Sequence, residues 1–341
     1  MYTENDLKDG IRQGIFTKKA VLKFQKYITS RGDYSEVDKE GFHFIAGFND
    51  VFVASASILL LFSILVAAMP FGDAVPITLF TISAWGLAEL FLRKSELALT
   101  SIVLVGSFVG GMFFSGIFWV HGHLHTHPPL IAMLVATVVA MLSTWIHWKR
   151  FHIPITLACG VLPPFLLLLY LPFYFSQGLT VYDDNWFLIL VFMMGVTVFT
   201  WAMWWDISDL ERGTERSDIA FWLHLIAAPM VVHPLFYSLG MFDEESSLMI
   251  LAIAITYYLF IILVSLIIDR RAFMLSSLIY LLTLFSAVLK SYGVIYDSLA
   301  LAGIIFASAL LILSTYWHQS RLKIMEKMPV WIQNRVPKFS S

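Results

Sequence analysis

The chain has 341 residues, of which 59% are hydrophobic, 16% are aromatic and only 13% are charged. Soluble globular domains carry about 25% charged residues, so this composition, with a mean hydropathy of +0.78, excludes a water-soluble protein. The net charge of −2 gives no basis for nucleic-acid binding, and the single cysteine, Cys159, excludes disulfides and thiol-ligated metal sites. The sequence therefore predicts a protein of the lipid bilayer.

Residues 1–50 are polar and are predicted to form a cytoplasmic segment with amphipathic helices. Residues 17–31 carry five positive charges and no acid, around apolar Val21, Phe24 and Ile28. A basic amphipathic helix of this kind binds the anionic lipid headgroups of the cytoplasmic leaflet, at about 1 kcal/mol per well-placed cation. Anchoring is the simpler interpretation, and binding of a protein partner or gating is the alternative.

The same segment carries the pattern L-x-x-G-I-x-x-G-I-F-T-x-x-A-x-x-x-F over residues 7–24, and Gly47-Phe48-Asn49-Asp50 then leads into the first apolar run. With the stretch around Glu89, this pattern resembles uncharacterised bacterial polytopic membrane proteins that open with a short N-terminal helical hairpin. The resemblance covers about the first third of the chain. It implies a bacterial inner-membrane protein, and it carries no activity or site residue with it.

Ten stretches of the chain have the roughly 20 predominantly apolar residues that a transmembrane helix requires. They are too long for the strands of a membrane barrel, which span the bilayer with about ten residues. The predicted fold class is an all-α bundle of about ten transmembrane helices over residues 51–317, followed by an interfacial tail over 318–341. The predicted spans are 51–69, 74–92, 98–120, 130–148, 153–175, 186–205, 219–240, 248–268, 273–292 and 298–317.

The positively charged residues predict the orientation of these spans. If the N-terminus is cytoplasmic, the cytoplasmic segments hold 21 of the 22 Lys and Arg residues, and Lys290 is the exception. Positive charge resists translocation across the membrane. The distribution therefore predicts that both termini are cytoplasmic, and the sequence also permits a homo-oligomer.

Two spans contain residues that predict unusual backbone packing. The third span has Gly106-x-x-x-Gly110 and Ser107-x-x-x-Gly111-x-x-x-Ser115, and small residues at this spacing let helix backbones approach closely. The fifth span has Pro163 and Pro164 shortly after Gly160, which predicts a kinked or re-entrant helix.

Glu89 is the one acidic residue well inside a predicted span, and Arg93 follows it by one helical turn. Ionisable groups within a bilayer are costly and commonly mark functional sites. An ion pair along the helix explains Glu89 structurally, and an ion- or proton-binding carboxylate in a pathway is the alternative.

The seventh span carries His224 and His233 together with Pro229 and Pro234. Nine residues turn an ideal helix by about 900°, so the two imidazoles are expected on opposite faces, each against a different neighbour. Two prolines leave backbone carbonyls without donors, as in the helices that line transporter cavities. These four residues are the leading candidates for a cavity or pathway, and a kinked but static core is the alternative.

The connection before that span, from Asp206 to Asp218, is the longest predicted cytoplasmic connection between spans. Arg212 and Arg216 within it have the side chains to bind a phosphate or a lipid headgroup. Mutual salt bridges on a solvated turn are the alternative.

Four alternating histidines, His121, His123, His125 and His127, lie between the third and fourth spans on the predicted outer face. Imidazole binds zinc, copper and nickel, so this loop is a candidate site for a divalent metal. The alternative is a solvated loop that binds metal only adventitiously.

Ten spans with short connections and two proline-interrupted helices favour a transporter or channel for a small solute or ion. A non-catalytic membrane protein that acts through structure or partner binding is the second reading, and an intramembrane enzyme acting on lipid is the third. No nucleophile–base pair or metalloprotease motif supports the enzyme, so no catalytic residue is predicted.

Overall fold

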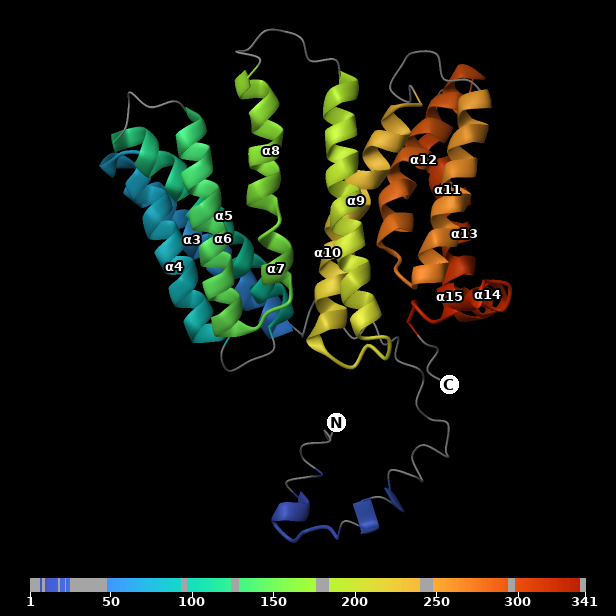
Figure 1. Ribbon diagram of the computed structural model, residues 1–341, viewed down its shortest axis with the longest axis horizontal. Helices are drawn as coiled ribbons and strands as arrows, with labels where there is room; N and C mark the ends of the chain where they lie inside the picture. The colour runs from blue at the N-terminus through green and yellow to red at the C-terminus, as the bar shows by residue number, and fades with distance from the viewer. Residues whose placement is uncertain are drawn as a thin grey trace. The chain divides into compact units, whose positions relative to one another are not determined.

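A computed structural model of the chain describes residues 7, 10–17, 19–21, 23–24, 48–92, 97–123, 129–175, 184–239, 248–293 and 298–337 (Figure 1). The chain divides into two compact units, Met1–His43 and Phe44–Ser341. Each unit is described by itself.

In the first unit, a tight turn joins two short helical segments. The turn needs Gly14, whose φ of 72° is favoured only by glycine, and Gly10, where a Cβ atom would lie 2.7 Å from the Phe16 ring. Thr17 then caps the next segment by accepting a hydrogen bond of 3.2 Å from the backbone N–H three residues later. The N-terminal pattern thus encodes a turn and a helix cap, whereas the predicted basic helix over 17–31 lies largely outside the described residues.

Among its described residues, the second unit contains ten helices that are long and apolar enough to cross a membrane, which confirms the predicted ten-helix bundle. All regular elements of the described residues are helical. The spans are α3 (Phe48–Ala68, extended by the 3-10 turn η1, Met69–Phe71), α4 (Ala74–Phe91), α5 (Ala98–His123), α6 (Pro129–Phe151), α7 with α8 (Ile155–Cys159 and Leu162–Phe175), α9 (Asp184–Ser208), α10 (Glu215–Tyr237), α11 (Leu248–Ile268), α12 (Ala272–Ser291) and α13 (Ser298–Thr315). Two short helices follow, α14 (Trp317–Met325) and α15 (Val330–Gln333).

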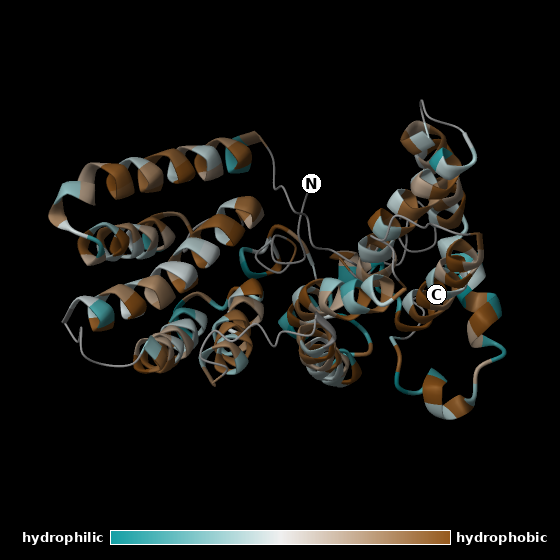
Figure 2. Cartoon of the chain, turned by 90° about the horizontal axis from the view of Figure 1, so that it is seen from above, coloured by the Kyte–Doolittle hydropathy of each residue, from teal (hydrophilic) through white to brown (hydrophobic). Residues whose placement is uncertain are grey.

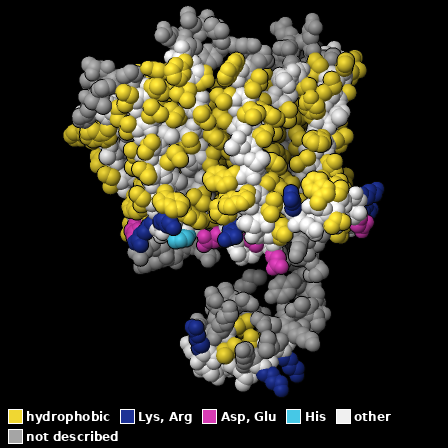
Figure 3. Space-filling model, in the orientation of Figure 1, with side chains coloured by type: hydrophobic (Ala, Val, Ile, Leu, Met, Phe, Trp, Pro, Cys, Tyr) yellow, Lys and Arg dark blue, Asp and Glu magenta, His cyan; other side chains and the backbone are white. Residues whose placement is uncertain are grey.

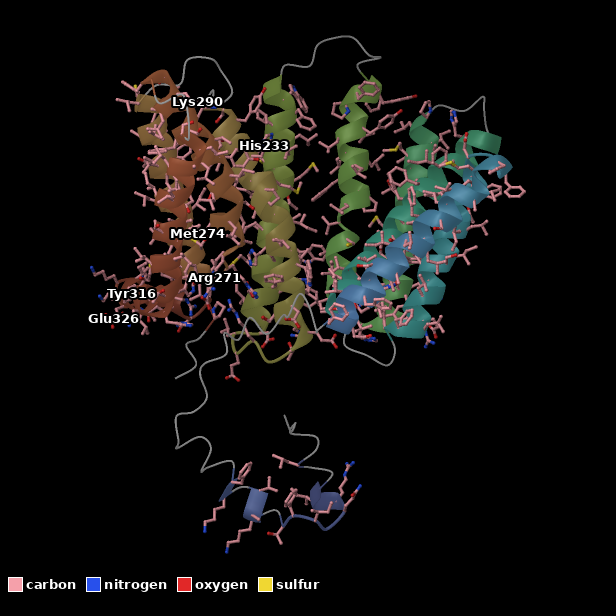
Figure 4. The ribbon with its side chains drawn as sticks, turned by 180° about the vertical axis from the view of Figure 1, so that it is seen from behind. His233, Arg271, Met274, Lys290, Tyr316 and Glu326 are labelled. Atoms are coloured by element: carbon pink, nitrogen blue, oxygen red, sulfur yellow. The ribbon has the colours of Figure 1, made fainter. Side chains whose placement is uncertain are left out.

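Charged and apolar side chains are segregated along these helices. Figure 2 shows hydrophobic residues along the helices and hydrophilic ones mainly at their ends. In Figure 3, hydrophobic side chains cover the face of the spans, and charged side chains gather at one end of the bundle. We call this the charged end: it is where α4, α6, α9 and α11 finish and where α5, α10 and α12 begin. Lys290 lies toward the opposite end of α12 from Arg271 (Figure 4).

The spans form two packed groups that the fifth span connects. Helix α5 packs against α3, α4 and α6, while α9 pairs extensively with α10, and α12 packs against α10, α11 and α13. Helix α7 contacts α5, α6 and α10, and α8 contacts α6 and α9. The interrupted fifth span therefore lies between the first four helices and the last five.

Close packing of α5 involves only one of the two predicted rows of small residues. A Cβ atom on Gly116 would lie 2.7 Å from Ala136 Cα on α6, and one on Gly111 would meet the Thr81 side chain on α4. At Gly106 and Gly110, a Cβ atom would have no neighbour within 4 Å outside its own helix backbone. The prediction of close packing therefore holds for the row that contains Gly111 and not for Gly106 and Gly110, because the spacing of small residues alone does not identify the face that meets a neighbour.

A buried carboxylate joins α3 to α5. Asp50 is fully buried near the start of α3. Its carboxylate accepts hydrogen bonds from the backbone N–H groups of Leu99 (2.8 Å) and Thr100 (2.9 Å) and from the Thr100 hydroxyl (2.8 Å). These are first-turn N–H groups of α5, which have no partner within their own helix. Asp50 thus acts as an N-cap from a different helix, held at the favourable end of the α5 dipole.

Candidate functional site

Four polar side chains that are almost inaccessible to solvent meet near the charged end of α9 and α10. They are Asp206, Ser217, His224 and Arg270, and we call them the buried charged cluster. Asp206 lies in the last turn of α9, Ser217 and His224 lie on α10, and Arg270 lies on the short connection between α11 and α12. The cluster therefore links three parts of the second group of spans.

The centre of the cluster is the Asp206 carboxylate, which accepts hydrogen bonds from two directions. Arg270 donates from Nη2 to Oδ1 at 2.5 Å and from Nε to Oδ2 at 3.3 Å, and His224 Nε2 lies 2.9 Å from Oδ2. Arg270 Nη2 also donates to the Ser217 carbonyl at 3.0 Å. A buried ion pair is tolerated only when its remaining polar atoms are hydrogen-bonded, and Arg270 meets this condition through Ser217.

His224 is the one member of the cluster with a polar atom left over. Because the ionised Asp206 carboxylate can only accept, Nε2 of His224 must be the protonated nitrogen. Its Nδ1 atom is buried and has no hydrogen-bond partner among the described residues. The ring packs between Phe199 of α9 and Phe273 of α12, at centroid distances of 5.4 and 6.1 Å. The Nδ1 lone pair is therefore a proton acceptor in an apolar environment, next to a carboxylate that would stabilise the imidazolium.

A second network lies beside the first and fastens the C-terminal helices to the bundle. Asp269 Oδ2 accepts from Arg212 at 3.0 Å and lies 3.4 Å from Arg321, while Oδ1 accepts from the Trp317 indole at 2.8 Å. Arg321, on α14, also donates to the carbonyls of Leu266 (3.1 Å) and Pro337 (2.7 Å). One carboxylate thus joins the α9–α10 connection, the end of α11 and helix α14.

Backbone geometry and electrostatics both show how constrained this second network is. Arg212 and Asp269 have φ values of 51° and 57°, a region that non-glycine residues adopt only when the surroundings impose it. Burial raises the pKa of Asp269, but the charges of Arg212 and Arg321 and the hydrogen bond from Trp317 outweigh burial. The pKa of Asp269 therefore lies below its usual value, and the carboxylate is ionised at neutral pH.

His233 and the two prolines of the seventh span lie away from the cluster. The Nδ1 atom of His233 is 2.9 Å from the Tyr280 hydroxyl of α12, and Phe236 stacks on the same tyrosine ring at 5.4 Å. The hydrogen bonds of the two histidines thus go to different helices, α9 for His224 and α12 for His233, whereas both rings pack against residues of α12. Helix α10 runs without interruption through Pro229 and Pro234, so the pathway predicted there remains a prediction.

Glu89 pairs across helices. Its carboxylate accepts from Arg150 of α6 in a two-point contact, with Nε at 3.2 Å from Oε2. The predicted partner, Arg93, lies outside the described residues. Glu89 therefore joins α4 to α6 at the charged end, and a role in a pathway is not required to explain it.

The two arginines of the α9–α10 connection, Arg212 and Arg216, lie in different surroundings. Arg212 is largely buried and bound to Asp269, as described above, whereas Arg216 is exposed and its backbone N–H donates to the Thr214 hydroxyl that caps α10. The binding of an anion or a headgroup by these two arginines remains a prediction.

The predicted metal loop is only partly described. His121 is exposed near the end of α5, and His123 is the last residue of that helix. His125 and His127, and the side chain of His123, lie outside the described residues. Among the residues that the structure describes, no group of three His, Cys, Asp or Glu side chains is arranged to hold a metal ion.

The sequence interpretation missed the cluster because the predicted spans leave Asp206 and Arg270 in connections between helices. Both residues are instead buried, with exposed fractions of 0% and 2%. Two signals were present in the sequence. Asp206 directly follows the apolar run Trp201-Ala202-Met203-Trp204-Trp205, and Arg270 lies in a connection of three residues between two spans, too short to carry its side chain far from the bundle.

Comparison with known proteins adds no assignment: no family model matches the chain, and no curated protein or solved structure is significantly similar to it.

Proposed function

We propose that this polytopic membrane protein is a proton-coupled transporter of a small solute, in the inner membrane of a bacterium and with both termini in the cytoplasm. The observation that carries the proposal is the buried contact between His224 and the Asp206–Arg270 ion pair. Histidine is the side chain that changes charge near physiological pH. Ionisable side chains enclosed within membrane bundles are expensive to maintain, and proton relays are one of their established uses.

The geometry supports a specific switching step. In the unprotonated state, Asp206 is shared between Arg270 and a neutral His224. A proton on Nδ1 of His224 would make the imidazole a second cation on the same carboxylate, beside the Arg270 guanidinium. The attraction that Asp206 exerts on Arg270 would then be divided between two cations. Arg270 belongs to the α11–α12 connection and Asp206 to α9, so protonation would weaken the link between these two parts.

Orientation supports the same proposal. If the segregation of Lys and Arg places the charged end in the cytoplasm, the cluster lies at the inner end of the bundle. His224 is nine residues into α10 from its first residue, Glu215, about 13 Å along the helix axis. A proton reaching His224 from the cytoplasm would therefore enter the bundle without crossing it.

The test is proton flux in proteoliposomes that contain the purified protein and an internal pH-sensitive dye. A panel of neutral small solutes is added outside while valinomycin and potassium clamp the membrane potential. We expect at least one solute to accelerate proton entry, and we expect His224→Gln, which keeps an N–H donor for Asp206 but cannot be protonated, to abolish the acceleration.

His233→Gln is the matched control, because it changes a histidine of the same helix that does not contact the cluster. Equal solute-dependent flux in the wild type and in His224→Gln would refute proton coupling through this residue. A protein whose fold is unchanged and whose flux is never solute-dependent would favour the structural, partner-binding reading.

A further inference from the structure

We infer that a cavity at the break in the fifth span binds a neutral aromatic molecule that carries one hydrogen-bond donor. The inference rests on the proposed transport function for its biological meaning, and it names the chemical class of the solute.

The break is built into the sequence of the fifth span. Helix α7 ends at Cys159 and α8 begins at Leu162. Pro163 and Pro164 have no N–H group, so the carbonyls of Cys159 and Gly160 lose the donors that a continuous helix would supply. Non-helical backbone at membrane depth is tolerated only where it is buried in protein or lines a cavity.

Neighbouring helices hold the break in place. Gly160 packs so closely against α6 that a Cβ atom there would lie 2.7 Å from Thr144 Cγ2. His147 of α6 is fully buried and its Nδ1 atom lies 3.2 Å from the Thr156 hydroxyl of α7. Contacts with α6 at Thr156, near the start of α7, and at Gly160, just after its end, therefore hold the interruption in a defined position.

A cavity of about 330 Å³ that is open on one side adjoins this break, and Met141, Trp145 and Trp201 in its lining are exposed. Its size is at the lower end of the range for small-molecule sites, about 300–1,000 Å³. It lies where the first group of spans meets the second, since α6, the α7–α8 break and α9 all contribute to its wall. The lining residues are Met141, Thr144, Trp145, Leu157, Gly160, Val161, Pro164, Phe165, Thr197, Val198 and Trp201.

The chemistry of the wall selects a neutral, apolar ligand. No charged residue lines the cavity, so an ionised ligand would lose its hydration without gaining a partner. The hydroxyls of Thr144 and Thr197 donate to carbonyls of their own helices, at 2.8 Å in both cases. Trp145, Phe165 and Trp201 supply aromatic rings, which favour an aromatic ligand over an aliphatic one of equal size.

The break supplies the polar part of the recognition. Gly160 both lines the cavity and owns one of the two carbonyls that Pro163 and Pro164 leave without a helical donor. A carbonyl can only accept, so the complementary ligand group is a donor such as a phenolic O–H or an aromatic N–H. A neutral aromatic molecule with one such donor would match both the apolar wall and the Gly160 carbonyl.

Helix α9 connects this cavity with the proton site. Val198 lines the cavity, and its neighbour in the sequence, Phe199, packs against His224. Helix α10, which carries His224, also contacts α7 directly. A ligand in the cavity and a proton on His224 would therefore act on the same helix from different faces.

The experiment measures binding of 1-naphthol, a neutral aromatic probe with one O–H donor, by equilibrium dialysis against the protein in lipid nanodiscs. Empty nanodiscs correct for partition into lipid. 1-Methoxynaphthalene is the matched ligand, with the same ring system and no donor. Thr197→Phe is designed to fill the cavity, and Thr200→Phe places the same ring on the exposed surface of α9, outside the cavity lining. Met141→Trp is a second filling variant at the rim, for the case that Thr197→Phe does not fold.

We expect saturable binding of 1-naphthol to the wild type and to Thr200→Phe. Either filling variant should weaken this binding by about tenfold or more. The added ring occupies part of the cavity, and the apolar contacts that 1-naphthol then loses are worth more than about 1.4 kcal/mol. The methoxy compound should bind about fivefold more weakly than 1-naphthol, as expected for one lost hydrogen bond. Circular dichroism and thermal unfolding establish that each variant is folded.

Binding of 1-naphthol no greater than to empty nanodiscs, or unchanged in a folded filling variant, would overturn the inference and would favour a lipid chain as the occupant. Equal binding of the two ligands would overturn the assigned donor. Failure of the proposed function is a separate result, because His224→Gln should bind 1-naphthol normally whether or not the protein couples solute to protons.

Discussion

Replacing Arg270 by methionine would leave the Asp206 carboxylate buried without its guanidinium partner. The two side chains are only 3% and 1% exposed, and their closest approach is 2.5 Å. At an effective dielectric constant of about 20, two unit charges about 4 Å apart attract by about 4 kcal/mol. Removing one partner of a buried pair costs about 3–5 kcal/mol, whereas exposed pairs contribute about 0–1 kcal/mol. We therefore expect Arg270→Met to reduce the free energy of unfolding by about 3–5 kcal/mol.

The assay is unfolding by SDS in mixed micelles, followed by circular dichroism, on Arg270→Met, Asp206→Asn and the double variant. The double variant removes both charges, so it should be more stable than the sum of the single effects predicts, by about 0.5–3 kcal/mol. Arg271→Met is the control, because that neighbouring guanidinium lies over the Trp317 ring at 5.0 Å, a contact worth about 0.5–1 kcal/mol at exposed sites, and we expect this variant to cost less than Arg270→Met.

The pH dependence of Arg270→Met gives a further check on the same reasoning. Without Arg270, a proton on His224 supplies the missing positive charge beside Asp206, so the variant should gain stability as the pH is lowered from about 8 to about 5.5. The claim that Asp206 and Arg270 form a buried, coupled ion pair would be refuted by either of two results. Each single variant could cost less than about 1 kcal/mol, or the double variant could lose the sum of the two single losses in stability.

Three further predictions concern the fold around the site. The pKa of Asp269 is lowered in the folded protein, so its contribution to stability is complete above its unfolded pKa of about 3.9 and is lost as the pH falls through the folded pKa. Between about pH 7 and pH 3, the unfolding temperature of Asp269→Asn should therefore fall less than that of the wild type. Asp50→Ala should reduce stability in SDS unfolding by at least about 1 kcal/mol, since it removes the cap of α5, and a change below a few tenths would contradict that role. Gly116→Leu should separate α5 from α6 and cost about 1–3 kcal/mol, whereas Gly106→Leu should be nearly neutral in the same assay.

The sequence was sufficient for the bundle because apolar length is a property of each span alone. Ten spans follow from ten apolar stretches, and the break in the fifth span follows from Pro163 and Pro164. The buried charged cluster could not be found in this way, because the burial of Asp206 depends on Arg270, which is 64 residues away in the chain. The predicted spans leave both residues in connections between helices, and only their three-dimensional contact shows that each supplies the other's counter-charge.

The cavity was also beyond sequence reasoning, although its residues were visible. Thr144 and Thr197 lie on different spans, and neither is unusual for a membrane helix. Gly160 was noted as part of a kink, but the space beside a kink depends on how far the neighbouring helices stand from it. Periodicity identifies which residues share a helix face and leaves the separation between helices undetermined.

The capping contact of Asp50 has a consequence for the order in which the protein is built. Its partners, the N–H groups of Leu99 and Thr100, are synthesised about 50 residues later. The Asp50 carboxylate, at the start of α3, therefore lacks these hydrogen-bond donors until α5 has inserted. Helices α3, α4 and α5 should thus assemble in one step of biogenesis. A ribosome stalled before residue 98 would leave α3 in the membrane without the hydrogen bonds between Asp50 and α5.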